Sequence, residues 1–166
     1  MPMDPNCLEK VSLFLSARNL PNVVSWGTTD PFLAVYEIDP KSNAMVKVGV
    51  TPCLKDTLNP DYATPFMLDY MFEATQNFVV RCYHYDGKHP IEPCEKHQLI
   101  GEVRFTLSQL MCSASTSLSC GMSNGHKKPG TLQLRAEPVV NTRDLFQVTF
   151  SANKLSNKDG FFGKSD

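Results

Sequence analysis

Five side chains able to bind a transition metal lie close together in one segment of the chain. They are two cysteines and three histidines between residues 82 and 97: Cys82, His84, His89, Cys94 and His97. Zn²⁺ favours such nitrogen and sulfur ligands in a tetrahedral arrangement. Their spacing matches no standard zinc finger, and Cys82 falls in an apolar run that predicts a strand with its thiol toward the core. We therefore expect a polar loop with buried cysteines here, and no zinc site.

Catalytic chemistry has little support in the sequence. A glycine-rich phosphate loop, a Gly-x-Ser-x-Gly nucleophile elbow and a His-Glu-x-x-His motif are all absent. Cys82 and Cys94 have histidines nearby, but no pattern supplies a fixed base or an oxyanion site. The sequence predicts a binding module and not an enzyme.

Charge and cysteine usage narrow the classes of partner and compartment. The net charge is −1, so no overall field attracts nucleic acid. Residues 1–10 lack the apolar segment of a secretory signal, and no apolar run is long enough to span a membrane. The six cysteines are scattered without a Cys-x-x-Cys pair, which favours free thiols in a reducing compartment. We expect a cytoplasmic protein that binds no nucleic acid.

The elements that must position these residues are predicted to be strands. Seven segments have the apolar pattern of strands and are separated by Gly, Pro and Asn turns: 11–15, 32–36, 44–50, 65–70, 78–83, 99–105 and 131–136. One helical turn is predicted over 107–111 with Ser108 as N-cap, and the Ser/Gly-rich segment 113–130 is predicted to be a mobile surface loop. Short strands at this spacing favour an all-β fold, an antiparallel β-sandwich.

One segment of the sequence occurs twice. Residues 16–22 (SARNLPN) are matched by residues 151–157 (SANKLSN), and each copy follows an alternating apolar strand. The two copies begin 135 residues apart, which is far too long for a solenoid repeat and suits a whole domain. We therefore predict a domain over residues 1–138, a linker over 139–144, and the first strand and loop of a second, truncated module over 145–166.

Three motifs carry a family resemblance. Thr29-Asp30-Pro31-Phe32 follows a loop, Thr57-Leu58-Asn59-Pro60 precedes a strand, and Leu99-Ile100-Gly101 follows a long loop. Together they resemble the signatures of a C2 domain, and residues 70–76 (YMFEATQ) and 132–137 (LQLRAE) are similar to the first C2 domain of a copine. The resemblance implies an eight-stranded antiparallel β-sandwich of the C2 type. It further implies that the domain binds anionic phospholipid, often through calcium, as a cytoplasmic protein peripherally associated with the plasma membrane.

The resemblance implies calcium ligands on two loops at one tip of the sandwich. Calcium takes six to eight oxygen ligands, for which the family supplies about five aspartates. Asp30 and Asp86 stand at two of those positions, whereas Val24, His84 and Gln98 stand at the other three. The resemblance therefore predicts weak calcium binding, or none, in the first domain.

The second, incomplete copy keeps acidic residues in the corresponding loop. Asp159 and Asp166 stand there as candidate calcium ligands, and Phe161 and Phe162 are candidates for insertion into a bilayer. We expect any calcium dependence to lie mainly in this second module.

The remaining candidate lipid contacts lie in the first domain. Trp26, the only tryptophan, shares a loop with Val23 and Val24. Two interpretations are open: the indole enters the membrane interface, where amphipathic rings are favoured, or it caps the sandwich core. Lys47 and Arg81, on two predicted strands, are candidates for binding phosphoinositide headgroups if they share one face.

Two functions from different classes remain. In the first, the domain docks on anionic phospholipid in a calcium-linked way. In the second, it is a calcium-independent domain that binds protein partners. The non-acidic residues at three ligand positions favour the second function, while the apolar loop residues and the tandem arrangement favour the first.

Overall fold

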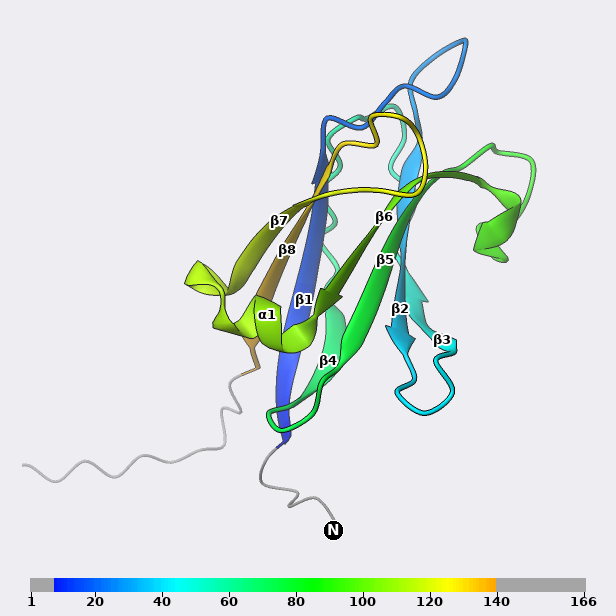
Figure 1. The fold of residues 1–166 in the computed structure, drawn as a ribbon. Helices are drawn as coiled ribbons and strands as arrows, with labels where there is room; N and C mark the ends of the chain where they lie inside the picture. The colour runs from blue at the N-terminus through cyan, green and yellow to red at the C-terminus, as the bar shows by residue number, and fades with distance from the viewer. Residues whose placement is uncertain (1–7, 140–166) are drawn as a thin grey trace, which may run out of the picture.

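The computed structural model describes residues 8–139, which form a β-sandwich of two four-stranded antiparallel sheets (Figure 1). One sheet has the order β4-β1-β8-β7, with β1 (Leu8–Arg18), β4 (Phe66–Met71), β7 (Ser117–Gly121) and β8 (Thr131–Pro138). The other has the order β3-β2-β5-β6, with β2 (Pro31–Ile38), β3 (Met45–Val50), β5 (Asn77–His84) and β6 (Gln98–Thr106). The predicted all-β sandwich is confirmed.

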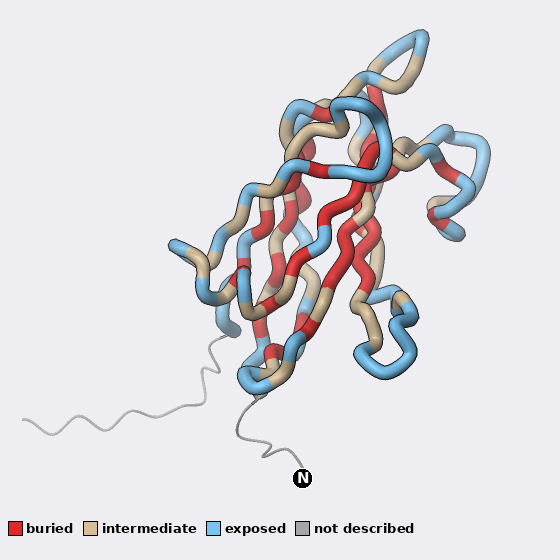
Figure 2. The backbone as a smooth tube through the Cα atoms, in the orientation of Figure 1, coloured by how far each residue is buried: buried red, intermediate tan, exposed pale blue. Residues whose placement is uncertain are grey.

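The facing sides of the two sheets form the main core. Along β1 the side chains of Val11, Leu13 and Leu15 are buried, while the residues between them are partly exposed. Leu132 and Leu134 of β8 continue this layer, and Figure 2 shows buried residues along the strands of both sheets. Burying an aliphatic side chain of this size contributes about 1.5–3 kcal/mol, so this alternation is sufficient to fix which face of each strand points inward.

A second, smaller cluster covers the outer face of the β3-β2-β5-β6 sheet. Phe32 and Tyr83 stack there with ring centroids 5.4 Å apart, and the ring of His97 is perpendicular to that of Phe32 with centroids 5.2 Å apart. The segment between β5 and β6, which contains the short 3₁₀ helix η2 (Cys94–Lys96), adds the buried Cys94 to this cluster. Residues 31–36 of β2 are consequently buried on both faces.

Four connections lie at the same end of the sandwich, which we call the loop end. They are residues 19–30, 51–65, 85–97 and 122–130, which join β1 to β2, β3 to β4, β5 to β6 and β7 to β8 (Figure 1). The opposite end carries the connections 39–44 and 72–76 and the helix α1 (Leu107–Cys112). Residues far apart in the sequence therefore meet at the loop end.

Two local predictions are wrong. The N-cap of α1 is Thr106 and not Ser108, because Thr106 and Gln109 form a reciprocal capping box. Segment 113–130 contains the 3₁₀ helix η3 (Ala114–Thr116) and the strand β7, and the backbones of Ser123 and His126 are hydrogen-bonded to β6. Its polar composition hides the strand, since β7 is an edge strand whose alternate residues are exposed.

Two further predictions concern the second module and membrane-spanning segments. The last strand of the sandwich ends at Pro138, while the predicted second module over 145–166 lies outside the described residues. Within the described range, the helices are too short and too polar to cross a bilayer.

Candidate functional site

Three connections at the loop end line a shallow cavity of about 300 Å³. The carboxylates of Asp30, Asp56 and Asp86 come from the three different connections, together with Lys55 and Trp26. The fold therefore brings together Asp30 and Asp86, the two candidate calcium ligands of the described domain.

Asp30 stands immediately before β2 and ties two neighbouring connections to it. Its side-chain Oδ1 accepts a hydrogen bond of 2.7 Å from the backbone N–H of Asp56. Its backbone N–H donates to Nδ1 of His84 at 3.1 Å, and its carbonyl accepts from the N–H of Tyr85 at 2.8 Å. The carboxylate of Asp30 thus has a structural partner within the protein.

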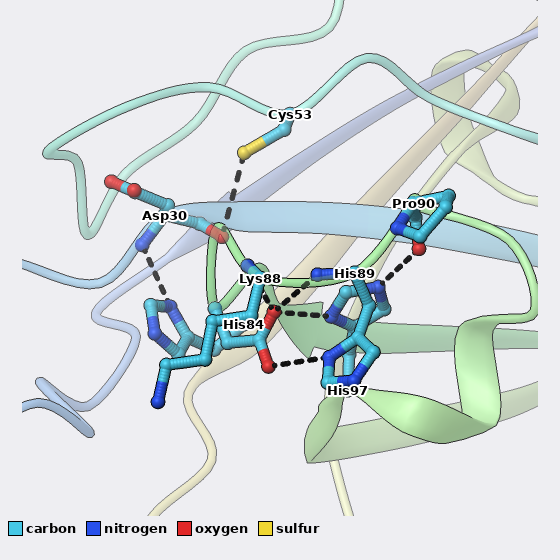
Figure 3. A network of polar contacts seen from close by, with 8 residues as sticks. Asp30, Cys53, His84, Lys88, His89, Pro90 and His97 are labelled. Carbon is cyan, nitrogen blue, oxygen red and sulfur yellow. Dashed lines mark hydrogen bonds and ion pairs between the residues drawn. The ribbon is translucent and has the colours of Figure 1, made fainter.

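Asp86 is the centre of a polar network in the connection between β5 and β6, and Figure 3 labels its partners Lys88, His89 and His97. Its Oδ1 accepts from the backbone N–H groups of Lys88 at 3.0 Å and His89 at 3.4 Å, and its Oδ2 lies 3.0 Å from Nδ1 of His89. Nδ1 of the buried His97 lies 3.5 Å from Oδ1 of Asp86. The backbone donor of Lys88, followed by His89, lowers the pKa of Asp86 to about 2.

This donor set does not fit a tight calcium site. Calcium requires several oxygen atoms free to converge on one ion, whereas oxygens of Asp30 and Asp86 already accept hydrogen bonds from the protein. Lys55, a cation, lines the same cavity. Over residues 8–139, His, Cys, Asp and Glu side chains form no group of three or more arranged to hold a metal. Asp159 and Asp166 lie outside the described residues.

The cysteine and histidine cluster is divided between the two faces of a sheet. Cys82 is fully buried in the main core, as predicted, and burial raises the pKa of its thiol. Cys94 belongs to the cluster on the outer face, and Nε2 of His97 contacts the carbonyl of Pro90 at 2.9 Å. Because the sheet separates the two thiols, they cannot bind one ion together.

Trp26 is the most exposed large apolar residue of the loop end. Its side chain is 95% exposed, so the interpretation that it caps the core is wrong. Val23 packs against the main core, and Val24 is partly buried at the edge of the cavity. Of the predicted membrane contacts in this loop, the indole is therefore the one that projects into solvent; Phe161 and Phe162 lie outside the described residues.

A comparison with protein families agrees with this fold. The model of the C2 domain matches residues 12–122, which is more than half of the chain. The chain belongs to the C2 domain family. The C2 domain is a binding module and not an enzyme, in agreement with the sequence prediction.

Individual relatives give a more detailed comparison of this C2 domain. The chain is 25% identical over 154 residues to Copine-B and 26% identical over 159 residues to Copine-E, both from Dictyostelium discoideum. Each match covers 92% of this chain, but 29% of Copine-B and 26% of Copine-E. The chain thus spans between a quarter and a third of the length of these relatives.

A solved structure shows the same architecture. A C2 domain of a plant Extended Synaptotagmin 1 superposes with a TM-score of 0.59 at 17% sequence identity, covering 84% of this chain and 100% of that one. At this identity the similarity concerns the fold alone.

The two candidate phosphoinositide ligands of the C2 domain share one sheet face, but each is paired with an acid. Lys47 is the cross-strand neighbour of Tyr36, and the guanidinium of Arg81 lies 5.7 Å from the centre of the same ring. Nζ of Lys47 lies 2.9 Å from a carboxylate oxygen of Glu92, and Nε of Arg81 lies 2.9 Å from Glu102. These ion pairs reduce the positive charge that the face presents to an anionic headgroup.

Glu102 is a buried charged residue that the sequence analysis missed. Its carboxylate accepts hydrogen bonds from Arg81 at 2.9 Å, Asn124 at 2.9 Å and Arg104 at 3.2 Å. Burial by itself raises the pKa of Glu102, but these three donors outweigh it, so the pKa lies below its usual value. The signal was a single acid within the apolar run 99–103, which required a buried partner.

Proposed function

We propose that this C2 domain is the first module of a copine-like protein and that it docks on anionic phospholipid membranes through its loop end. The similarity to Copine-B and Copine-E over 92% of the chain supports the copine assignment. The main observation that supports a docking surface at the loop end is the exposed indole of Trp26. An indole held in water at a loop tip is stabilised when it enters a membrane interface, because its apolar ring and its N–H are both accommodated there.

Basic side chains at the same end support an electrostatic attraction to the membrane. Lys55, Lys88, Lys127 and Lys128 are exposed on three different connections of the loop end. A lysine near an anionic surface contributes about 1 kcal/mol at physiological ionic strength. The combination of one inserted ring and several lysines suits a reversible, peripheral association. We infer a cytoplasmic protein that associates in this way with the plasma membrane.

Calcium enters this proposal through the second module. The described acidic residues form no group of three or more arranged to hold a metal, whereas the second copy has Asp159 and Asp166 in the corresponding loop of the sequence. We propose that calcium dependence resides mainly in residues 145–166 and the module that they begin. When bound there, the metal would supply positive charge that bridges acidic loops to lipid phosphate.

Vesicle co-sedimentation tests this function. The chain is mixed with phosphatidylcholine vesicles or with vesicles that also contain phosphatidylserine, each with calcium or with a chelator. We expect binding to the phosphatidylserine vesicles that weakens as salt is raised, because salt screens the lysines. Absence of binding to both vesicles in all conditions would refute membrane docking and favour the protein-binding alternative.

Paired substitutions locate any calcium response. If calcium strengthens vesicle binding, the variant that combines Asp30→Asn and Asp86→Asn should retain this response. The variant that combines Asp159→Asn and Asp166→Asn should lose it. The reverse pattern would show that the calcium site lies in the first domain.

A further inference from the structure

The two sheets of the sandwich leave a seam between their free edges. β6 is the last strand of one sheet and β7 the last strand of the other. The connection that follows β7 is hydrogen-bonded to β6, through the antiparallel bridge between Glu102 and Ser123 and through the N–H of His126, which donates to the carbonyl of Ile100 at 2.8 Å. Beyond this bridge the two strands are not paired, and α1 packs against both of them at the opposite end (Figure 1). We call residues 104–106 and 117–120 the β6–β7 seam.

The backbone of β7 presents unused hydrogen-bonding groups to the seam. Along an antiparallel ladder, successive residues direct their N–H groups to opposite sides. The N–H of Met122 donates to Gly130 at 3.0 Å on the β8 side, whereas the N–H of Ser123 donates to Glu102 at 2.9 Å on the β6 side. By this alternation the N–H of Ser119 points away from β8 and into the seam.

The backbone of β6 also directs unpaired hydrogen-bonding groups into the seam. The N–H of Glu102 donates to Ser123 at 2.8 Å, away from β5. Arg104, two residues later, therefore directs its backbone N–H and C=O away from β5 as well. Within residues 8–139 these groups of Arg104 and Ser119 have no backbone partner across the seam. Two edges with unpaired backbone face each other, which is the arrangement that accepts an added strand.

The space between the two edges is large enough for a peptide and is mainly apolar. It forms a cavity of about 590 Å³, within the range of ordinary ligand pockets. Phe105, Leu118 and Cys120 contribute apolar surface to the cavity, and Cys112, the last residue of α1, also lines it. An extended segment places alternate side chains on one face, so apolar residues at every second position would cover this floor.

The charge beside the seam selects an acidic partner. The guanidinium groups of Arg81 and Arg104 share the single carboxylate of Glu102, which leaves one positive charge in excess. The side chain of Arg104 is 59% exposed and lines the cavity, and the other lining residues carry no carboxylate. A carboxylate on the bound strand near Arg104 would balance this charge.

We propose that the β6–β7 seam binds an extended segment of a partner protein by strand addition, with apolar side chains at alternate positions and an acidic residue beside Arg104. This function is separate from membrane docking, because the seam lies beside α1 whereas the connection 19–30, which carries Trp26, lies at the loop end (Figure 1). One C2 domain would then hold a membrane and a protein partner at the same time.

A defined peptide tests the proposal on the full chain. The probe is a fluorescent nine-residue peptide in which valine alternates with threonine and the central threonine is replaced by aspartate; in the control peptide lysine replaces this aspartate. We expect the aspartate peptide to bind at least tenfold more tightly. Bound peptide should also slow alkylation of the partly exposed Cys120 at least tenfold, measured by mass spectrometry. Alkylation of Cys53, which lies in the loop-end connection 51–65, should be unchanged.

Two substitutions separate strand addition from general stickiness. Ser119→Pro removes an N–H that β8 does not use, so the fold should be kept, as checked by circular dichroism, while peptide binding is lost. Arg104→Gln should remove the preference for the aspartate peptide, whereas Arg135→Gln, on the outer face of β8, should leave it intact. Peptide binding that survives Ser119→Pro overturns the proposal, as does the absence of any Cys120 protection. Protection of the Ser119 amide from hydrogen exchange before peptide is added would also overturn it, since the seam would then already be filled by this chain or a second copy.

Discussion

Substitution of Trp26 by alanine tests the proposed membrane contact most directly. A tryptophan buries about 150–250 Å² when it is covered, and apolar burial is worth roughly 25 cal/mol per Å². The indole of Trp26 is 95% exposed, so nearly all of this area is available to a membrane. If the interface covers about half of the ring, Trp26→Ala should weaken vesicle binding by about 2 kcal/mol, or roughly 30-fold.

The same substitution should leave the fold unaffected. An exposed side chain contributes little to the free energy of unfolding, so the urea midpoint of Trp26→Ala should match that of the unchanged protein. Phe72→Ala is the matched control, because Phe72 is 77% exposed in the turn between β4 and β5, at the end opposite the loop end. Binding to phosphatidylserine vesicles is measured by co-sedimentation over a range of lipid concentrations. The reasoning is refuted if Trp26→Ala binds as tightly as the unchanged protein, or if Phe72→Ala loses as much affinity.

Three further predictions concern the stability and reactivity of the domain. Glu102→Gln should lower the free energy of unfolding by about 2 kcal/mol, since it weakens a buried charge network. The pKa of Glu102 is lowered in the fold, so its contribution is present above the unfolded value of about 4.3 and is lost as pH falls through the lower folded value; urea titrations of both proteins between pH 7 and pH 3 should therefore converge. Gly125→Ala should destabilise by about 1–3 kcal/mol, because an added Cβ would collide with the backbone of Ile100; an unchanged thermal midpoint would contradict this. Mass spectrometry after brief treatment with iodoacetamide should find the exposed Cys112 alkylated and Cys82 unmodified until the protein is unfolded, because Cys82 is buried with a raised thiol pKa.

The local patterns of the sequence were sufficient to predict most strands. Alternation in β1 and the apolar run of β2 each carry the signal within a few residues, since burial of one strand face repeats every second position. The same reasoning missed β7, whose residues Ser117–Gly121 are polar and small. An edge strand with one half-buried face gains its order from pairing with β8, and no periodicity within the segment records that pairing.

The candidate site was likewise predicted in part from the sequence and decided in part by the fold. The family resemblance pointed to Asp30 and Asp86 and implied three calcium positions without an acidic residue, while Trp26 was singled out as the only tryptophan. Only the tertiary structure decided that both carboxylates have internal donors and that the indole projects into solvent. Lys47 and Arg81 lie on one sheet face, which their predicted strands allowed. Their acidic partners, Glu92 and Glu102, come from other segments of the chain.

The physical reason for this difference is the distance along the chain between the residues that determine each property. Strand pattern depends on neighbours along the chain, so the sequence by itself determined a β-sandwich, and its motifs gave the resemblance to the C2 domain that implied few calcium ligands. Availability of a carboxylate, neutralisation of a lysine or exposure of a ring depends on which distant segments converge. Asp86 meets His97, and Arg81 meets Glu102, only because the antiparallel order of the strands brings them together. The tertiary structure therefore decided which of the candidate residues remain free to bind a partner.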